Sequence, residues 1–340
     1  MGLDLIPLPE NSPMAIAGKQ ANVHAARAVF MDYRTRKAKN TTRRQDADLA
    51  LFAQYLQEIG LSAGNFGEDP KAWQGITRGL VEGFVKWQLL KGYAVESVNV
   101  RLSTIKTYAK LALRAGALDV SEYAMLRTVQ GYGHKEGKRI DEKRKADGLS
   151  TRKGAKKAHA VILTEEQAVQ LMARGETPKG IRDAFMLCLM LEHGLRVSEI
   201  AALQIHNFDI HNRRMTFYRE KVSKEQTHRL TDRTFEAVQA YFKIAPNEGS
   251  VWRRGAHKGK TNLTVQGLTV RAINKRVELL GRRMGIENLS PHDLRHYWAT
   301  NASRKGTSVK NLQEAGGWNS PAMPLHYIEA EQVANDGVII

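Results

Sequence analysis

The stretch Ile181-Arg-Asp-Ala-Phe-Met-Leu-Cys-Leu-Met-Leu-Glu-His-Gly-Leu-Arg-Val-Ser-Glu-Ile200 decides how the second half of the chain folds. Residues 181–192 are strongly apolar and predict a buried helix, in which Cys188 is a small core residue. Gly194 interrupts this run, and Arg196 follows beside the predicted core. An arginine in that place is either a surface residue or a cation held in position for chemistry.

The sequence around this stretch predicts a mainly helical domain with a small antiparallel sheet. Thr164-Glu-Glu-Gln167 has the capping-box pattern and precedes a helix that continues through Ala173. Three short strands are expected, at Phe208–Ile210, Met215–Tyr218 and Thr227–Leu230. The first two are joined by a turn at His211–Arg214. Helical periodicity then returns through Phe242, Val270–Met284 and Asp293–Arg304.

The first half of the chain predicts a small all-α domain with a basic surface. Leu49, Phe52, Leu56 and Ile59 recur at the spacing of one helix face, with Thr41 or Thr42 as a cap and Gly60 as the end. Further helices are expected over Ile76–Lys91 and Val98–Ala115. The first 20 residues are expected to be poorly ordered.

Between these halves lies a strongly basic segment. Ten lysines and arginines fall between His134 and Ala158, with almost no apolar residue, so we expect a segment that buries no core. The predicted organisation is a flexible N-terminus (1–20), a helical domain (21–130), a basic linker (131–160) and a second, mainly helical domain with a small sheet (161–340).

Composition points to a polyanionic partner. The 340 residues include 52 Lys and Arg against 35 Asp and Glu, a formal net charge of +17. No apolar run approaches the roughly 20 residues of a membrane span, and the N-terminus does not resemble a signal peptide. A single cysteine excludes a disulfide framework and a cysteine-based zinc site. We therefore expect a soluble, intracellular protein.

Three segments carry residues suited to breaking a phosphodiester without a metal. That reaction needs a nucleophile, cations for the charged transition state and an acid for the leaving oxygen. Arg196 is one candidate cation. In His292-Asp-Leu-Arg-His296, the spacing places His292, Arg295 and His296 on one helical face. Tyr327 follows Trp318 by nine residues, and Pro324 is suited to the first position of a short helix carrying Tyr327.

Each segment also has a simpler explanation. His292 and His296 stand four residues apart, as in a zinc pair, but the glutamate of the HExxH pattern is missing. Tyr327 and Trp318, each taken alone, are more typical of packed core aromatics than of a reactive site. Only their combination with Arg196 and Arg295 favours chemistry.

Together the three segments resemble the tyrosine recombinase/integrase family, which includes phage integrases and Xer-like recombinases. The likeness covers the chain from about Val161 onward and implies a site-specific recombinase that forms a covalent 3′-phosphotyrosine at Tyr327, with no cofactor and no metal. It implies that Arg196 and Arg295 clamp the scissile phosphate and that His292 assists proton transfer. Trp318 would occupy the place more often held by histidine, where its indole N–H can only donate.

The resemblance also implies a catalytic lysine between the second and third strands. Lys221 and Lys224 both lie there, and Lys221, just after the strand, is preferred. Glu199 and His296 are expected to orient the residues that touch the phosphate. Further DNA contacts are expected from basic residues of the linker, hairpin and helical domain: Lys224, Lys143, Arg144, Lys145, Arg101 and Lys106.

The family implies that the helical domain binds DNA and that the domain from residue 161 is catalytic. It also implies specific duplex sites and further copies of the chain as partners, in a tetramer on two duplexes, and a cytoplasmic location associated with the nucleoid through DNA. The stretch Ile328–Ile340 is either a docking tail or a frayed end. Biological roles consistent with the resemblance are integration or excision of a mobile element and resolution of replicons. Two alternatives stay open: a type IB-like topoisomerase, and a DNA-binding protein with a vestigial site.

Overall fold

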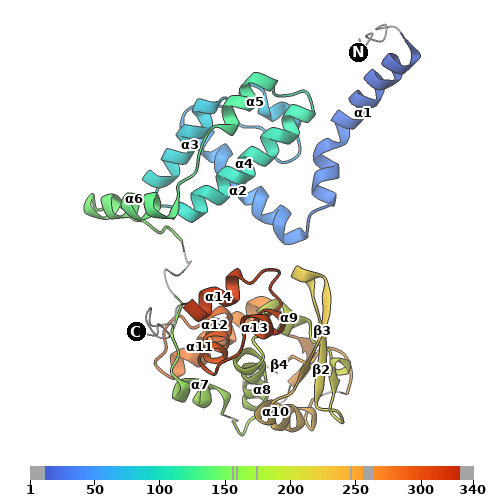
Figure 1. The fold of residues 1–340 in the computed structure, drawn as a ribbon, viewed down its shortest axis with the longest axis vertical. Coiled ribbons are helices and arrows are strands. Elements are labelled where there is room, and N and C mark those ends of the chain that lie inside the picture. Colours follow the sequence, from blue (N-terminus) through green and yellow to red (C-terminus); the bar gives the residue numbers. More distant parts are fainter. Residues whose placement is uncertain are drawn as a thin grey trace, which may run out of the picture. The chain divides into compact units, whose positions relative to one another are not determined.

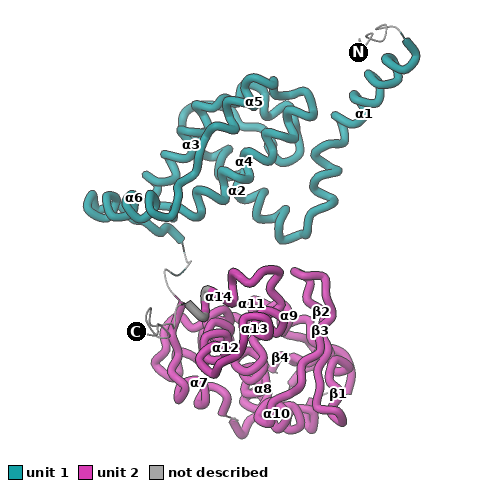
Figure 2. The backbone as a smooth tube through the Cα atoms, viewed as in Figure 1, with its two compact units in different colours: residues 1–158 teal, residues 159–340 magenta. Residues whose placement is uncertain are grey.

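The computed structural model describes residues 12–154, 157, 160–173, 175–245, 247–255 and 263–329. The chain divides into two compact units, residues 1–158 and 159–340, coloured separately in Figure 2. Each unit has its own hydrophobic core, so each is described by itself.

Unit 1 is a helical domain (Figure 1). Its core is rich in aromatic side chains. Phe52 lies between Trp73 and Phe84 and is fully buried with them. Its elements are α1 (Pro13–Thr35), α2 (Lys39–Glu58), the 3₁₀ helix η1 (Pro70–Trp73), α3 (Arg78–Leu90), α4 (Val95–Arg114), α5 (Val120–Arg127) and α6 (His134–Ala146). The helices predicted from periodicity correspond to α2, α3 and α4.

Two details at the N-terminal side differ from the sequence analysis. The prediction that the first 20 residues are poorly ordered is wrong for residues 13–20, because Ser12 caps α1 and Pro13 opens it. Residues 1–11 lie outside the described part of the chain. Helix α2 begins at Lys39 after Ala38, so Thr41 and Thr42 lie in its first turn and do not cap it.

The basic segment expected to act as a linker contains helix α6. Its Glu136 side chain accepts from the backbone N–H of Gly133, which fixes the first turn. The helix is partly enclosed even though it contributes no apolar core residue, because Gly137 and Arg144 are buried. The high charge of the segment argued against a packed helix. An arginine can nevertheless be buried, because its aliphatic stem packs against apolar groups and its N–H groups donate to backbone carbonyls.

Unit 2 combines helices with two small antiparallel sheets (Figure 1), and several of these helices pack against the buried helix α8. Its helices are α7 (Glu165–Met172), α8 (Pro178–Glu192), α9 (Val197–Ala202), α10 (Asp232–Phe242), α11 (Val270–Arg283), α12 (Pro291–Arg304), α13 (Val309–Gly316) and α14 (Ala322–Glu329), with 3₁₀ helices η2 (Ile205–Asn207) and η3 (Glu220–Val222). Residues 182–191 of α8 are all buried, as the apolar run predicts. The predicted capping box at Thr164 is confirmed.

The predicted three-stranded antiparallel sheet is present, in the order β1-β2-β3. Its strands are β1 (Phe208–Asp209), β2 (Arg214–Arg219) and β3 (Lys224–Arg229). Strand β3 begins three residues before the predicted start, and Lys224 pairs with Arg219. A second sheet of β4 (Arg253–Gly255) and β5 (Leu263–Gly267) was not predicted. No helix in the described residues is long and apolar enough to cross a membrane.

Candidate active site

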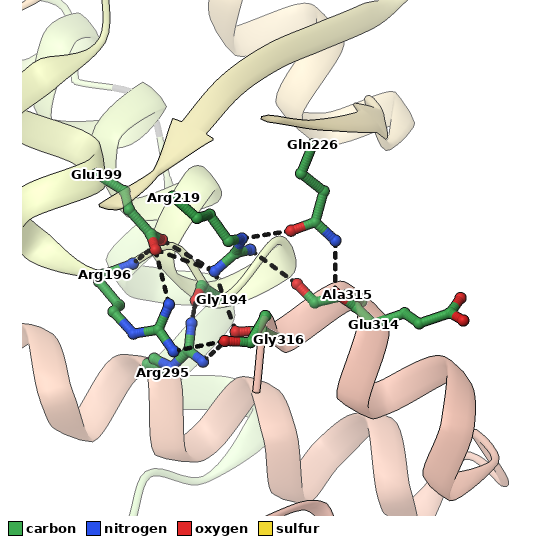
Figure 3. Close-up of polar contacts among 10 residues, drawn as sticks. Gly194, Arg196, Glu199, Arg219, Gln226, Arg295, Glu314, Ala315 and Gly316 are labelled. Atoms are coloured by element: carbon green, nitrogen blue, oxygen red, sulfur yellow. Dashed lines mark hydrogen bonds and ion pairs between the residues drawn. The ribbon is translucent and has the colours of Figure 1, made fainter. Parts of the chain in front are cut away.

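Three arginines from different elements of unit 2 converge on the end of helix α13 (Figure 3). Arg196 is the residue before α9, Arg219 ends β2, and Arg295 lies in α12. The last carbonyls of a helix have no partner within it and carry partial negative charge. These carbonyls are the acceptors that bring the three guanidinium groups together.

Each guanidinium donates to a carbonyl in this last turn. Arg295 Nη2 donates to Gly316 O at 2.5 Å, and its Nη1 donates to Gly194 O. Arg196 Nη2 donates to Gly317 O at 2.9 Å. Arg219 donates to Gly316 O at 3.0 Å and to Ala315 O at 2.8 Å.

One carboxylate lies among these cations. Glu199 accepts from Arg196 Nη1 at 2.8 Å and from the Arg196 backbone N–H at 2.8 Å. It also accepts from Arg219 Nη1, with 3.1 Å to each oxygen. Three guanidinium groups against one carboxylate leave two positive charges in excess, so the cluster favours an anionic ligand.

Burial sharpens this charge excess. Desolvation, followed by the repulsion of Arg196 and Arg219, lowers the pKa of Arg295 to about 9. Desolvation likewise lowers the pKa of Arg219 to about 10, although Glu199 opposes the shift. Both groups are still cationic at neutral pH, and an incoming phosphate would relieve the repulsion between them.

Two glycines allow this close packing. Gly194 has a φ of +60°, and a Cβ there would lie 2.2 Å from the Trp298 ring. Gly317 has a φ of +59°, and a Cβ there would lie 2.5 Å from Cδ of Arg219. A side chain at either position would therefore meet both backbone strain and a steric clash.

The three residues of the His-x-x-Arg-His motif differ in burial. Arg295 is buried, His296 is half-buried and His292 is exposed. Their shared helical face therefore runs from the surface into the site. The zinc alternative has no support, since no group of three or more metal-binding side chains occurs among the described residues.

Tyr327 lies in α14 and is 3% exposed. Its ring packs edge-on against His296, with centroids 5.0 Å apart, and lies 5.7 Å from the Trp318 ring. Burial raises the pKa of Tyr327, while Arg295 acts in the opposite direction. The prediction that Pro324 occupies the first position of this helix is wrong. Helix α14 begins at Ala322, and Pro324 is its third residue.

Trp318 joins the tyrosine to the arginine cluster. Arg295 lies over its ring, with Cζ 4.6 Å from the centroid, and Trp298 stacks on it at 6.0 Å. The indole N–H of Trp318 has no hydrogen-bond partner among the described residues. It is therefore a donor that a ligand could use.

Both candidate lysines lie at the tip of the β2–β3 hairpin and are exposed. Lys221 is in η3, and Lys224 is the first residue of β3. Ser223 between them has a φ of +46°, which closes the turn. Neither lysine contacts the arginine cluster through a hydrogen bond or ion pair of the described residues, so the geometry favours neither.

The expected DNA-contacting residues of unit 1 fall into two groups. Lys143 and Lys145 are exposed on α6. Arg144 between them is 6% exposed and donates to Tyr93 O at 3.0 Å and Ser150 O at 2.7 Å. The guanidinium of Arg144 is therefore engaged with backbone carbonyls of unit 1, and its contact with DNA stays a prediction.

Arg101 and Lys106 of α4 are also engaged within unit 1. Arg101 lies over the Tyr93 ring at 4.2 Å and donates to Gln88. Lys106 donates to Arg127 O at 3.0 Å, and burial lowers its pKa. These contacts stabilise the helical domain.

Arg219 and Gln226 are two residues of this cluster that the sequence pattern did not predict. Arg219 is 1% exposed, and its Nε donates to Gln226 Oε1. A signal was present, because Met215 and Phe217 alternate inward along β2 and Arg219 continues that register. Because arginine is charged, position 219 was not predicted to face the core.

Comparison with known proteins assigns the family. The sequence pattern of the phage integrase family matches residues 162–333. The chain belongs to this family. Phage integrase family members of this kind are tyrosine recombinases, which cleave and rejoin DNA through a tyrosine, so the chain is an enzyme of that class. The mainly helical fold with small antiparallel sheets is the fold of the family's catalytic domains.

Relatives and solved structures agree with this family. The chain is 26% identical over 264 residues to the tyrosine recombinase XerC of Actinobacillus succinogenes, covering 76% of this chain and 78% of that one. The XerC of Herpetosiphon aurantiacus is 24% identical, covering 88% and 87%. A lambda integrase dimer bound to a COC′ core site has a TM-score of 0.62 at 14% identity, covering 93% of this chain and 99% of that chain. The Tn1549 transposon integrase with transposon right end DNA has a TM-score of 0.60 at 16% identity, covering 90% and 94%.

Proposed function

We propose that this phage integrase family member is a site-specific recombinase in which Tyr327 forms a covalent 3′-phosphotyrosine. The observation that carries the proposal is the cluster of Arg196, Arg219 and Arg295, which holds two uncompensated positive charges. A phosphodiester approaching attack by tyrosine gains negative charge, and such a preorganised cluster stabilises it. Arg295 also interacts electrostatically with Tyr327, which couples the nucleophile to the cluster.

Arg196 and Arg295 would bind the non-bridging oxygens of the scissile phosphate. A guanidinium has five N–H donors, and the contacts described occupy one donor on each terminal nitrogen of either residue. Donors therefore remain on both arginines for a bidentate contact. The indole N–H of Trp318 supplies a further donor without transferring a proton.

The reaction then proceeds by proton transfer at both ends of the bond. Because burial raises the pKa of Tyr327, the phenol needs a base, and His292 is the residue proposed to take its proton. The Tyr327 Oη–P bond forms as the P–O5′ bond breaks, and a lysine proton, from Lys221 in preference to Lys224, passes to O5′. The reverse sequence religates the strand without ATP, since the phosphotyrosine retains the diester energy. Glu199 and His296 orient Arg196 and Tyr327 respectively.

The proposed partner is duplex DNA with specific sites, bound by a homotetramer on two duplexes in the cytoplasm. The proposed roles are integration or excision of a mobile element, or resolution of replicons. Lys224, Lys143 and Lys145 are proposed as phosphate contacts, which would make affinity depend steeply on salt. Residues 330–340 of the expected docking tail lie outside the described residues.

A nicked cognate duplex tests the proposal directly, because the nick lets the cleaved end diffuse away and traps the adduct. The wild-type chain is expected to form a DNA adduct that survives denaturation, and Tyr327→Phe is expected to form none. Tyr218→Phe is the matched control, since Tyr218 is 56% exposed on β2 and is expected to behave as wild type. An adduct that persists in Tyr327→Phe would overturn the assignment of the nucleophile.

Exchange between two duplexes separates the alternatives. A recombinase joins strands from different sites, whereas a type IB-like topoisomerase removes supercoils without exchanging partners. A protein with a vestigial site would bind DNA and form no adduct. Mapping the phosphotyrosine position on DNA recovered from the complex then identifies the target site.

A further inference from the structure

Arg219 is the most enclosed side chain of the arginine cluster. All three of its nitrogens donate: Nε to Gln226, Nη1 to Glu199 and Gly316 O, and Nη2 to Ala315 O. It therefore has little donor capacity left for DNA, unlike Arg196 and Arg295. Its guanidinium links β2, on which it lies, to β3, α9 and the end of α13 (Figure 3).

Gln226 supplies a second link from the neighbouring strand. It accepts from Arg219 and donates through Nε2 to Glu314 O at 2.5 Å. Gln226 pairs with Phe217 in the β2–β3 ladder, so both strands of the hairpin are tied to the last turn of α13. That turn leads directly into Gly317 and Trp318.

An apolar side chain would occupy the position of Arg219 with a smaller desolvation penalty. Met215 and Phe217 occupy the two preceding inward positions of β2, and burying an arginine requires desolvation that a hydrophobic residue avoids. Gly317, in its left-handed conformation, provides the space for the arginine stem. The arrangement is thus built around a guanidinium, which indicates a role beyond filling the core.

We propose that Arg219 is a positioning residue that fixes the β2–β3 hairpin, and hence the lysine at its tip, against the phosphate-binding arginines. Lys221 follows Arg219 by two residues, and Lys224 is paired with it across the hairpin. The inference rests on the proposed function, in which that lysine gives its Nζ proton to O5′ while the Tyr327 Oη–P bond forms and the P–O5′ bond breaks.

A change of leaving group isolates this step. When sulfur replaces the bridging O5′, the P–S bond breaks and a thiolate leaves without needing a proton, because a thiol is far more acidic than an alcohol. If a residue acts by placing the general acid, its substitution slows cleavage of the oxygen substrate but not of the sulfur substrate. If a residue only maintains the fold or binds phosphate, its substitution slows cleavage of both substrates.

The experiment measures single-turnover cleavage of matched oxygen and sulfur substrates. Arg219→Met is expected to cleave the oxygen substrate about 100-fold more slowly than wild type and the sulfur substrate within about 3-fold of it. Arg219→Lys keeps the charge but loses the planar fork, and the same pattern is expected from it. Arg214→Met, an exposed arginine at the other end of β2, is the matched control and is expected to match wild type. Lys221→Ala and Lys224→Ala identify which lysine shows the pattern.

Equal slowing of both Arg219 variants on the two substrates would overturn the inference, and so would an unchanged rate on the oxygen substrate. If Arg219→Met does not fold, as judged by thermal unfolding, Arg219→Lys decides alone. Failure of the proposed function gives a different result, since the wild-type chain would then form no adduct with either substrate.

Discussion

Arg219 donates to both carboxylate oxygens of Glu199 at 3.1 Å, and this pair is among the most deeply buried ion pairs of unit 2. The same carboxylate accepts from Arg196. Glu199 thus separates two guanidinium groups that would otherwise repel each other, and it holds them at fixed positions before any phosphate arrives.

Replacing Glu199 by glutamine is expected to destabilise unit 2 by about 3 kcal/mol, because a buried charge loses its partner. The measurement is the free energy of unfolding in urea. Glu225→Gln, on the exposed part of β3, is the control and is expected to change stability by less than about 0.5 kcal/mol. A loss below about 1 kcal/mol in Glu199→Gln would contradict the role given to this carboxylate.

Trp318→Phe is expected to slow cleavage roughly 10- to 100-fold, because the ring is kept while the N–H donor is lost. Trp318→His keeps a donor and is expected to be faster than the phenylalanine variant. Single-turnover cleavage at saturating DNA measures both rates, and thermal unfolding confirms that both variants are folded. Equal rates for the two variants would show that Trp318 acts by packing alone.

Lowering the pH is expected to destabilise unit 2 through His193. This histidine is 4% exposed, its Nε2 has no partner in the described structure, and burial lowers its pKa to about 4. The unfolded chain takes up a proton near pH 6.5, whereas the folded chain does so only near pH 4. Stability due to this group is therefore present above pH 6.5 and falls as pH drops toward 4.

Between pH 7 and pH 5.5 the expected loss from His193 is about 1 kcal/mol. His228, whose pKa burial lowers to about 3, adds a change of the same sign. Urea unfolding at several pH values measures the slope, which His193→Gln is expected to flatten. His206→Gln, at an exposed histidine, leaves the slope unchanged. A slope that is identical in wild type and His193→Gln would refute this assignment.

Neighbouring residues of α6 are expected to respond oppositely to alanine. Lys143→Ala and Lys145→Ala each reduce the slope of log affinity against log salt by about 1, with stability unchanged, because each loses one phosphate contact. Arg144→Ala lowers the unfolding midpoint of unit 1 instead, because the carbonyls of Tyr93 and Ser150 lose their donor. Binding measured at several salt concentrations, with thermal unfolding beside it, distinguishes the two effects. A reduced salt slope in Arg144→Ala with unchanged stability would instead show that Arg144 contacts DNA and does not stabilise unit 1.

Much of this protein follows from local sequence pattern. Periodicity located α2, α3, α4 and the buried α8, since the residues of one helix face recur within a single segment. The order of Arg196, His292, Arg295, Trp318 and Tyr327 identified the family without any coordinates. The net charge of +17 pointed to a polyanionic partner such as nucleic acid.

Burial of charged groups is what only the tertiary structure decided. From the sequence alone, the charged side chains of Arg219 and Arg144 are expected to be solvated. Both are buried instead, because distant backbone carbonyls accept from their N–H groups. The acceptors of Arg219 lie 96 and 97 residues away along the chain, at the end of α13. A local pattern contains no record of such a partner. The sequence therefore predicted Arg196, Arg295 and Tyr327 as candidate site residues, and only folding decided that Arg219 lies beside the two arginines.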